Sequence, residues 1–276
     1  MNSVVWLVVC MSIMMLTPAV ALPQGNVQVD YPLNVRGLAR FDDTQQQDLQ
    51  AWLNTATMAT EQVVGSFPFA VTVHLHPRRG NEPVPWANTW REDGQAVHFY
   101  VDTRFPRRAF EHDWTAYHEF AHLALPYLGS RNRWFAEGFA SFMQYPIMAS
   151  AGTLDVSPGE AYWRKLSGHW AGYQRQESAL SMIEQRFAER RYKSGYWAAA
   201  WFFILADKQL RERHNTTLPA LVKQYVACCR LNDTTLQDVI HQWDRLIGQP
   251  LFASLLRRFA TQPASHIYSQ HNSAAF

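Results

Sequence analysis

The feature that most constrains this chain of 276 residues is a pair of histidines four positions apart. His118 and His122 flank Glu119 in the segment H-E-F-A-H. Four residues of an α-helix turn the chain by about 400°, so both imidazoles leave the same face one turn apart, and Glu119 projects beside that face. The spacing predicts a helix through this segment that carries half of a metal site.

The chemistry of zinc explains why these residue types belong together. A catalytic zinc takes three protein ligands and leaves a position to water, whose pKa falls toward neutrality. Glu119 is placed to accept a proton from this metal-bound water and pass it to a leaving group. Asp113 is expected to cap a helix from Trp114 to Leu125, which Pro126 ends, so the motif lies in the middle of a helix.

A second helical stretch follows from Arg133 to Phe142, and Glu137 is its only acidic residue. Its neighbours are apolar or small, and a carboxylate on such a face is costly to bury without a partner. Glu137 is therefore a candidate third ligand. An exposed glutamate at a helix start is the alternative interpretation.

The two segments H-E-F-A-H and W-F-A-E-G-F-A together resemble the gluzincins, a group of zinc metallopeptidases. The resemblance implies that His118, His122 and Glu137 hold one Zn²⁺ ion and that Glu119 is the general base. The spacing of 14 residues between His122 and Glu137 is closest to that of compact bacterial members. Sharp motifs cover only residues 118 to 142.

Gluzincins also supply a downstream side chain that stabilises the oxyanion of the reaction intermediate. The segment R-Y-K-S-G-Y-W resembles the stretch that carries this tyrosine in the aminopeptidase branch, which indicates Tyr192, with Tyr196 as the alternative. Simple packing of both rings at a helix start remains an equal interpretation.

Two departures from the family pattern stand out. Ser141 occupies the position at which thermolysin-like enzymes place an aspartate that orients a zinc-bound histidine, so this support must come from elsewhere. No G-x-M-E-N-like segment precedes the zinc helix, so amino-terminal trimming is not indicated.

The first residues resemble a secretory signal peptide. A largely apolar run from Val4 to Leu16 is too short for a comfortable membrane span, and A-V-A before Leu22 fits a cleavage site. We expect cleavage after Ala21, a secreted or periplasmic protein, and no stable membrane anchor afterwards. Cys10 lacks the small preceding residue that lipoprotein processing prefers.

Composition and charge limit the remaining possibilities. With 47% hydrophobic and 17% charged residues the chain is globular, and a formal charge of +2 does not imply a nucleic-acid partner. Adjacent cysteines bridge only through a strained turn, so Cys228 and Cys229 are predicted to be helical and unbridged, with a redox or metal role left open.

Hydrophobic periodicity predicts a two-part, zincin-like α+β fold, in which a small mixed-sheet lobe precedes a mainly helical lobe and the active site lies in the cleft between them. A helix is expected from Asp42 onward, strands over 69–76 and 96–102, and helices over 197–211, 218–231, 236–247 and 251–259. The predicted units are a signal peptide (1–21), a mixed lobe (22–112), a zinc-binding helical lobe (113–261) and a polar tail (262–276) that frays or packs across a surface groove.

In gluzincins the strand before the zinc helix forms a sheet edge that can pair with an extended substrate. By resemblance the substrate-binding residues here are Val97, His98, Phe99 and Tyr100, although a core strand without this role explains them equally well. His74 and His76 share one side of a strand and could bind a second metal, but no third ligand is evident at suitable spacing, and an exposed strand face explains them better.

Two functional hypotheses follow. The first is a secreted zinc metallopeptidase acting on a peptide or protein, with a peptidoglycan stem peptide as one candidate substrate. The second is a non-catalytic gluzincin-fold module for peptide binding or envelope assembly. The sequence does not indicate an oligomeric state.

Overall fold

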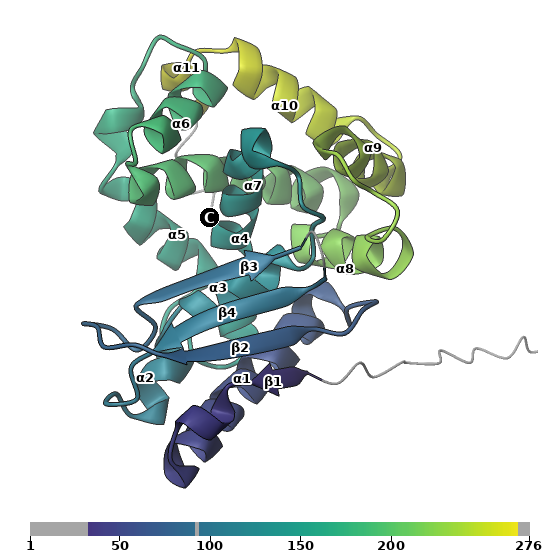
Figure 1. The fold of residues 1–276 in the computed structure, drawn as a ribbon. Helices are drawn as coiled ribbons and strands as arrows, with labels where there is room; N and C mark the ends of the chain where they lie inside the picture. Colours follow the sequence, from purple (N-terminus) through teal and green to yellow (C-terminus); the bar gives the residue numbers. More distant parts are fainter. Residues whose placement is uncertain (1–32, 92–93, 270–276) are drawn as a thin grey trace, which may run out of the picture.

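A computed structural model describes residues 33–91 and 94–269 and confirms the predicted α+β class (Figure 1). A small sheet is followed by a mainly helical region, and the two pack around one continuous apolar core. The predicted signal peptide, with Ala21 and Cys10, lies outside the described residues, as does the end of the polar tail.

In the described part of the chain four strands form one sheet in the order β1-β2-β4-β3. Strands β1 (Asn34–Arg36), β2 (Thr72–Pro77) and β4 (Ala96–Val101) run parallel, whereas β3 (Trp86–Trp90) runs antiparallel to β4. The register pairs Asn88 with His98 on one sheet face and Thr89 with Val97 on the other.

The prediction that residues 96–101 form a sheet edge is wrong. Strand β4 pairs with β2 on one side and with β3 on the other, so its backbone groups are already used. Strand β3, which was not predicted from the sequence, takes the edge position beside the helical region (Figure 1).

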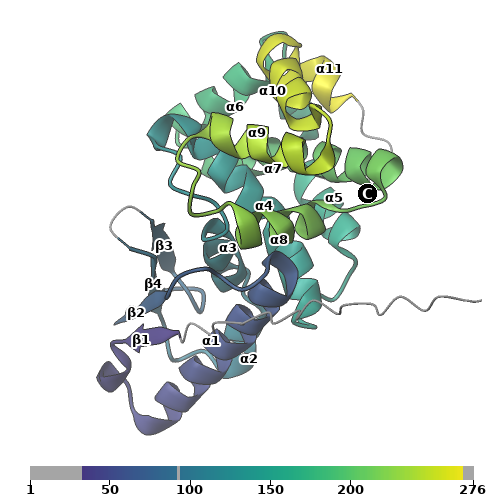
Figure 2. The ribbon, with the colours of Figure 1, turned by 90° about the vertical axis from the view of Figure 1, so that its right-hand side faces the viewer.

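Buried and partly exposed side chains alternate along β2 and β4, so the two faces of the sheet differ. Val73, Leu75, Val97 and Phe99 are buried against the helices on one side. Helix α1 (Asp43–Val64) begins at a capping box between Asp42 and Gln45 and lies on this covered side, as Figure 2 shows. No helix of the described chain covers the other face (Figure 1).

The helical region confirms most of the predicted helices and adds others. The remaining α-helices are α2 (Arg107–His112), α3 (Thr115–His122), α4 (Arg133–Ser150), α5 (Pro158–Ser167), α6 (Ala179–Ala188), α7 (Tyr192–His214), α8 (Leu218–Cys228), α9 (Leu236–Ile247), α10 (Leu251–Thr261) and α11 (Ala264–Tyr268), with short 3₁₀ turns at Leu38–Arg40, Ser130–Asn132 and Trp170–Tyr173. Helices α2, α5, α6 and α11 were not individually predicted from the sequence.

The tail predicted from residue 262 onward begins with a buried helix. Ile267 and Tyr268 are fully buried, and the Tyr268 hydroxyl donates to the carbonyl of Ala198 at 2.7 Å. Fraying is therefore wrong for 262–269, because α11 (Ala264–Tyr268) buries its apolar side chains in the core.

The expectation that the two adjacent cysteines are unbridged is also wrong. Cys228, the last residue of α8, and Cys229, just beyond it with a non-helical φ of −138°, form a disulfide. Among the described residues, no helix combines the length and apolar character required to cross a bilayer.

Helices α4 and α7 approach closely at Gly138. A Cβ atom at this position would lie 2.7 Å from the carbonyl carbon of Ala199 and 2.8 Å from its oxygen. These are backbone atoms, so relief would require the helices to move apart.

We expect Gly138→Ala to lower the free energy of unfolding by about 1–3 kcal/mol, because overpacking outweighs the gain in helix propensity. Gly168→Ala is the matched control: Gly168 has φ −67° and nothing within 4 Å of the added atom, so stability should stay equal or rise by about 0.4–1 kcal/mol. Urea denaturation of both variants measures the difference, and equal stabilities would contradict the close approach.

Candidate metal centre

Helix α3 carries the H-E-F-A-H segment but is shorter than predicted. The Asp113 carboxylate accepts from the backbone N–H of Thr115 at 2.8 Å, as expected for a residue at the helix start. The helix ends at His122 rather than at Leu125. The next residues make tighter i to i−3 bonds, such as Leu125 N–H to the carbonyl of His122 at 3.1 Å.

Two arginines, one half-buried and one buried, bind the carbonyls at this helix end. Arg91 donates to the carbonyl of His122 at 2.9 Å, and Arg230 donates to that of Leu123 at 2.9 Å. Burial lowers the pKa of both guanidinium groups, to about 10 for Arg230, yet both stay charged at neutral pH. Their charge complements the negative end of the helix dipole. Neither residue was a candidate at the sequence level, because they lie 31 and 107 positions from their partners.

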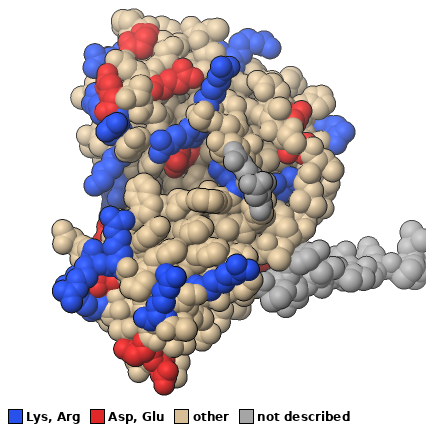
Figure 3. All heavy atoms as spheres, viewed as in Figure 1, with Lys and Arg blue, Asp and Glu red and all other residues tan. Residues whose placement is uncertain are grey.

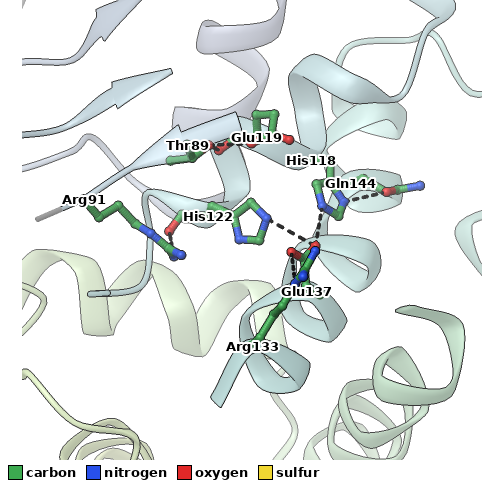
Figure 4. Close-up of polar contacts among 8 residues, drawn as sticks. All are labelled: Thr89, Arg91, His118, Glu119, His122, Arg133, Glu137 and Gln144. Carbon is green, nitrogen blue, oxygen red and sulfur yellow. Dashed lines mark hydrogen bonds and ion pairs between the residues drawn. The ribbon is translucent and has the colours of Figure 1, made fainter. Parts of the chain in front are cut away.

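The structure brings the three predicted ligands together (Figure 4). The Nε2 atom of His118 lies 3.3 Å from Oε2 of Glu137, and Nε2 of His122 lies 3.7 Å from the same oxygen. One candidate ligand atom from each residue falls within 4.8 Å of the others, in the only such group among the described residues. Glu137 is on α4, so two helices supply the set.

Gln144 orients one of the two histidines. Nδ1 of His118 lies 3.1 Å from Oε1 of Gln144 and can donate to it, which leaves Nε2 facing Glu137 and free to bind a cation when Nδ1 carries the only ring proton. This contact supplies the support that the expected aspartate would give at Ser141. Gln144 is two helical turns beyond Glu137 on the same buried helix, a spacing that could have pointed to it.

Electrostatics keep the Glu137 carboxylate negatively charged beside the two histidines. Burial alone would raise the pKa of Glu137, but hydrogen bonds from His118 and His122 lower it well below its usual value. Burial lowers the pKa of His122, whereas contact with Glu137 outweighs burial at His118 and raises its pKa. Arg133 is a further neighbour, with its Nε 3.5 Å from Oε1 of Glu137.

Glu119 lies on the same helix but contacts the sheet. Its Oε2 accepts from the Thr89 hydroxyl at 2.6 Å, and the same hydroxyl lies 3.0 Å from the Glu119 carbonyl oxygen. Figure 4 shows the carboxylate beside Thr89 of β3 rather than between the three ligand groups. The side chain is buried next to the ligands and is held by the edge strand.

The two candidate tyrosines lie in different surroundings. The Tyr196 ring is 6.1 Å from the His118 ring, centroid to centroid, and burial followed by the charge of Glu137 raises the pKa of its phenol, which therefore stays protonated. Tyr192 is 37% exposed, and its ring packs under the Arg133 guanidinium at 4.9 Å. The geometry favours Tyr196, the alternative of the sequence analysis, over Tyr192.

The four residues predicted to bind substrate are not brought to this site. Val97 and Phe99 are fully buried in the core, and His98 and Tyr100 project from the opposite face of the sheet. Because β4 is a central strand, it offers no free backbone for pairing.

The residues present could hold a metal ion, and their donor atoms are of the types that zinc binds. Two imidazole nitrogens and one carboxylate oxygen are a known catalytic ligand set for zinc. Nδ1 of His122 is buried without a hydrogen-bond partner in the described part of the chain. That atom can carry the proton while Nε2 faces the ion. Comparison with known proteins finds no family model and no curated protein that matches this chain.

We expect Gln144→Leu to weaken zinc binding by about 10- to 100-fold, because His118 loses the acceptor that fixes its tautomer and ring orientation. Ser141→Ala is the matched control, since none of the described hydrogen bonds joins Ser141 to a ligand histidine. Competition with a chromophoric chelator measures both affinities. Unchanged affinity in Gln144→Leu would show that this contact does not support the metal.

Proposed function

We propose that this protein is a zinc-dependent hydrolase of peptide bonds. The observation that carries the proposal is the convergence of His118, His122 and Glu137, from two helices, with a second buried carboxylate, Glu119, on the same helix as the histidines. A bound zinc would acidify a water and polarise a substrate carbonyl.

Glu119 is the residue we assign to proton transfer. The Thr89 hydroxyl restricts its carboxylate to the β3 side of α3, so its position relative to the histidines is set before substrate arrives. A carboxylate held there can accept a proton from the attacking water and deliver it to the leaving amine.

Tyr196 is the residue we assign to the oxyanion. Its protonated phenol is a hydrogen-bond donor, and its ring packs against His118. A hydrogen-bond donor already held near the oxygen that becomes negative in the transition state lowers the activation barrier, because no group has to reorganise during the reaction.

The edge strand β3 suits an extended peptide substrate. One side of β3 is unpaired in the described sheet, and Thr89 in the same strand contacts Glu119. A peptide added beside β3 would present its backbone next to the proposed base. This proposal replaces the prediction that Val97, His98, Phe99 and Tyr100 of β4 bind the substrate.

The unpaired edge of β3 supports a peptide as the substrate class. A peptide or protein substrate is proposed, with a peptidoglycan stem peptide as a candidate for an exported protein. Export itself rests on the signal peptide predicted in residues 1–21, and the oligomeric state is left open. A non-catalytic peptide-binding or envelope-assembly module is the alternative function, and the hydrolysis experiment below separates the two.

We expect Glu119→Gln to reduce turnover of a peptide library by about 10²–10⁴-fold while zinc content stays at the wild-type level, because the variant keeps the ligands and loses the base. Glu160→Gln, which removes an exposed carboxylate on α5, is the control and should keep wild-type turnover. Equal turnover by Glu119→Gln would eliminate the proposed base. Bound zinc without turnover in the wild type would support the binding module.

We expect Tyr196→Phe to lower kcat by about 10²–10³-fold with little change in KM, since the lost donor acts mainly in the transition state. Tyr192→Phe serves as the matched variant one helical turn away and should leave kcat within a few-fold of wild type. Steady-state kinetics on one cleaved peptide decides between them. A loss confined to Tyr192→Phe would reverse the assignment.

A further inference from the structure

Aromatic and imidazole rings occupy the side of the sheet that no described helix covers. The register places His76 of β2, Tyr100 of β4 and Trp86 of β3 in one row across three strands. His74 and His98 pair in the next row and project to the same side, because residues two positions apart on a strand share a face. We call the side of the sheet that these rings share the open face.

Two tryptophans of the open face are exposed to solvent. Trp86 is 56% exposed and Trp90 is 61% exposed. They are four positions apart on β3, so both project from the open face and lie about 13 Å apart along the strand. The Trp90 ring packs against the His98 ring at 5.2 Å between centroids. Single exposed apolar side chains are normal, but several large rings grouped on one face indicate an interaction site.

The imidazoles of the open face are stacked. The rings of His74 and His98 are nearly parallel with centroids 4.4 Å apart, and His76 stacks on Tyr100 at 4.6 Å. Rings that cover one another turn mainly their edges to solvent, and the edges of an imidazole carry the nitrogens that form hydrogen bonds. Parallel rings do not direct these nitrogens at one point. The stack therefore suits hydrogen bonds to the hydroxyl groups of a ligand.

These imidazoles are neutral at neutral pH. Burial, together with nearby positive charge, lowers the pKa of His74, His76 and His98 below the usual value for histidine. The three side chains therefore offer hydrogen bonds without charge.

Three exposed arginines border the open face and give it positive charge. Arg36 is in β1, beside β2, and Arg40 places its Nη1 3.4 Å from Nδ1 of His76. The guanidinium of Arg78 lies over the Tyr100 ring, 5.7 Å from its centroid. In Figure 3 the centre of this face carries no acidic side chain, and basic side chains border it. The border of the open face therefore attracts anions.

This combination of rings, neutral hydrogen-bonding groups and a few cations matches the chemistry of an acidic sugar polymer. The C–H groups on the face of a sugar ring contact the electron-rich face of an indole. Sugar hydroxyls form hydrogen bonds with imidazole edges, and a guanidinium binds a carboxylate through paired bonds. A nucleic-acid strand carries a phosphate at every nucleotide and is bound by cations that follow its backbone, whereas here the cations surround a neutral centre.

We propose that the open face binds an acidic polysaccharide, a chain of sugars that bear carboxylate groups. Trp86 and Trp90 stack on sugar rings of this chain. The guanidinium groups of Arg36, Arg40 and Arg78 bind its carboxylates.

The open face is separate from the candidate metal centre. Trp90 and Thr89 are adjacent on β3 and project to opposite sides of the sheet, and Thr89 contacts Glu119. The proposal therefore does not depend on the proposed hydrolase activity, and binding can be measured without turnover.

Isothermal titration calorimetry of the full chain with hexagalacturonate, a chain of six carboxylate-bearing sugars, tests the proposal. We expect Trp90→Ala to weaken binding by about 5- to 50-fold, because a central stacking ring is lost, and Trp90→Phe to recover part of the affinity. Trp163→Ala removes a 42% exposed tryptophan on α5 and is the matched control, with wild-type affinity expected. Far-UV circular dichroism verifies folding, and Trp86→Ala is a second variant if Trp90→Ala fails to fold.

Arg36→Gln tests the role of charge. It should weaken binding several-fold and reduce the dependence of affinity on salt, whereas Arg164→Gln, which removes an exposed arginine on α5, should change neither. A neutral chain of six glucose units should bind about 10-fold more weakly than hexagalacturonate. No binding of hexagalacturonate, equal binding of both sugars, an equal loss in Trp163→Ala, or tighter binding of oligothymidylate would overturn the proposal.

Discussion

The Glu137 carboxylate joins the metal centre to the packing of the helices around it. Two histidines of α3 approach one of its oxygens at 3.3 Å and 3.7 Å, so an acid that would be costly to bury alone has two partners. The next residue, Gly138, brings α4 against the backbone of α7 at Ala199. Helix α7 in turn carries Tyr196 against His118. The adjacent residues Glu137 and Gly138 therefore supply the third candidate ligand and allow the close approach of α4 to α7, respectively.

The sheet contributes to the same site through its edge. Thr89 binds the Glu119 carboxylate, and Arg91, just beyond β3, binds the carbonyl of His122. Arg230 arrives from the end of α8 and binds the next carbonyl. Helix α3 is short, and these contacts add donors to carbonyl groups at its end, where the carbonyl of His122 also accepts from Leu125. The position of the two histidines thus depends on segments that are distant in the sequence.

Local patterns were sufficient for some features and insufficient for others. The helix over 236–247 was predicted with the bounds that α9 has, because its apolar spacing is regular and Gly248 marks its end. Strand β3 was missed because W-A-N-T-W has no clear alternation of apolar and polar residues, and the edge position was then assigned to β4. Gln144 was missed because a glutamine on a buried helix has no distinctive motif. The cysteine pair was misjudged because the end of α8 could not be located from periodicity alone.

The sequence by itself determined the helix that carries His118, Glu119 and His122, and it named Glu137 as the acid to meet them, because helical spacing and the cost of burying a carboxylate act locally. Tertiary structure alone decided which strand forms the sheet edge and which tyrosine lies near His118. It also decided that Gln144 orients the His118 ring. It also placed His98 beside His74 and His76. These outcomes depend on pairing between distant segments, and the register of strands and the crossing of helices are settled only when the whole core packs.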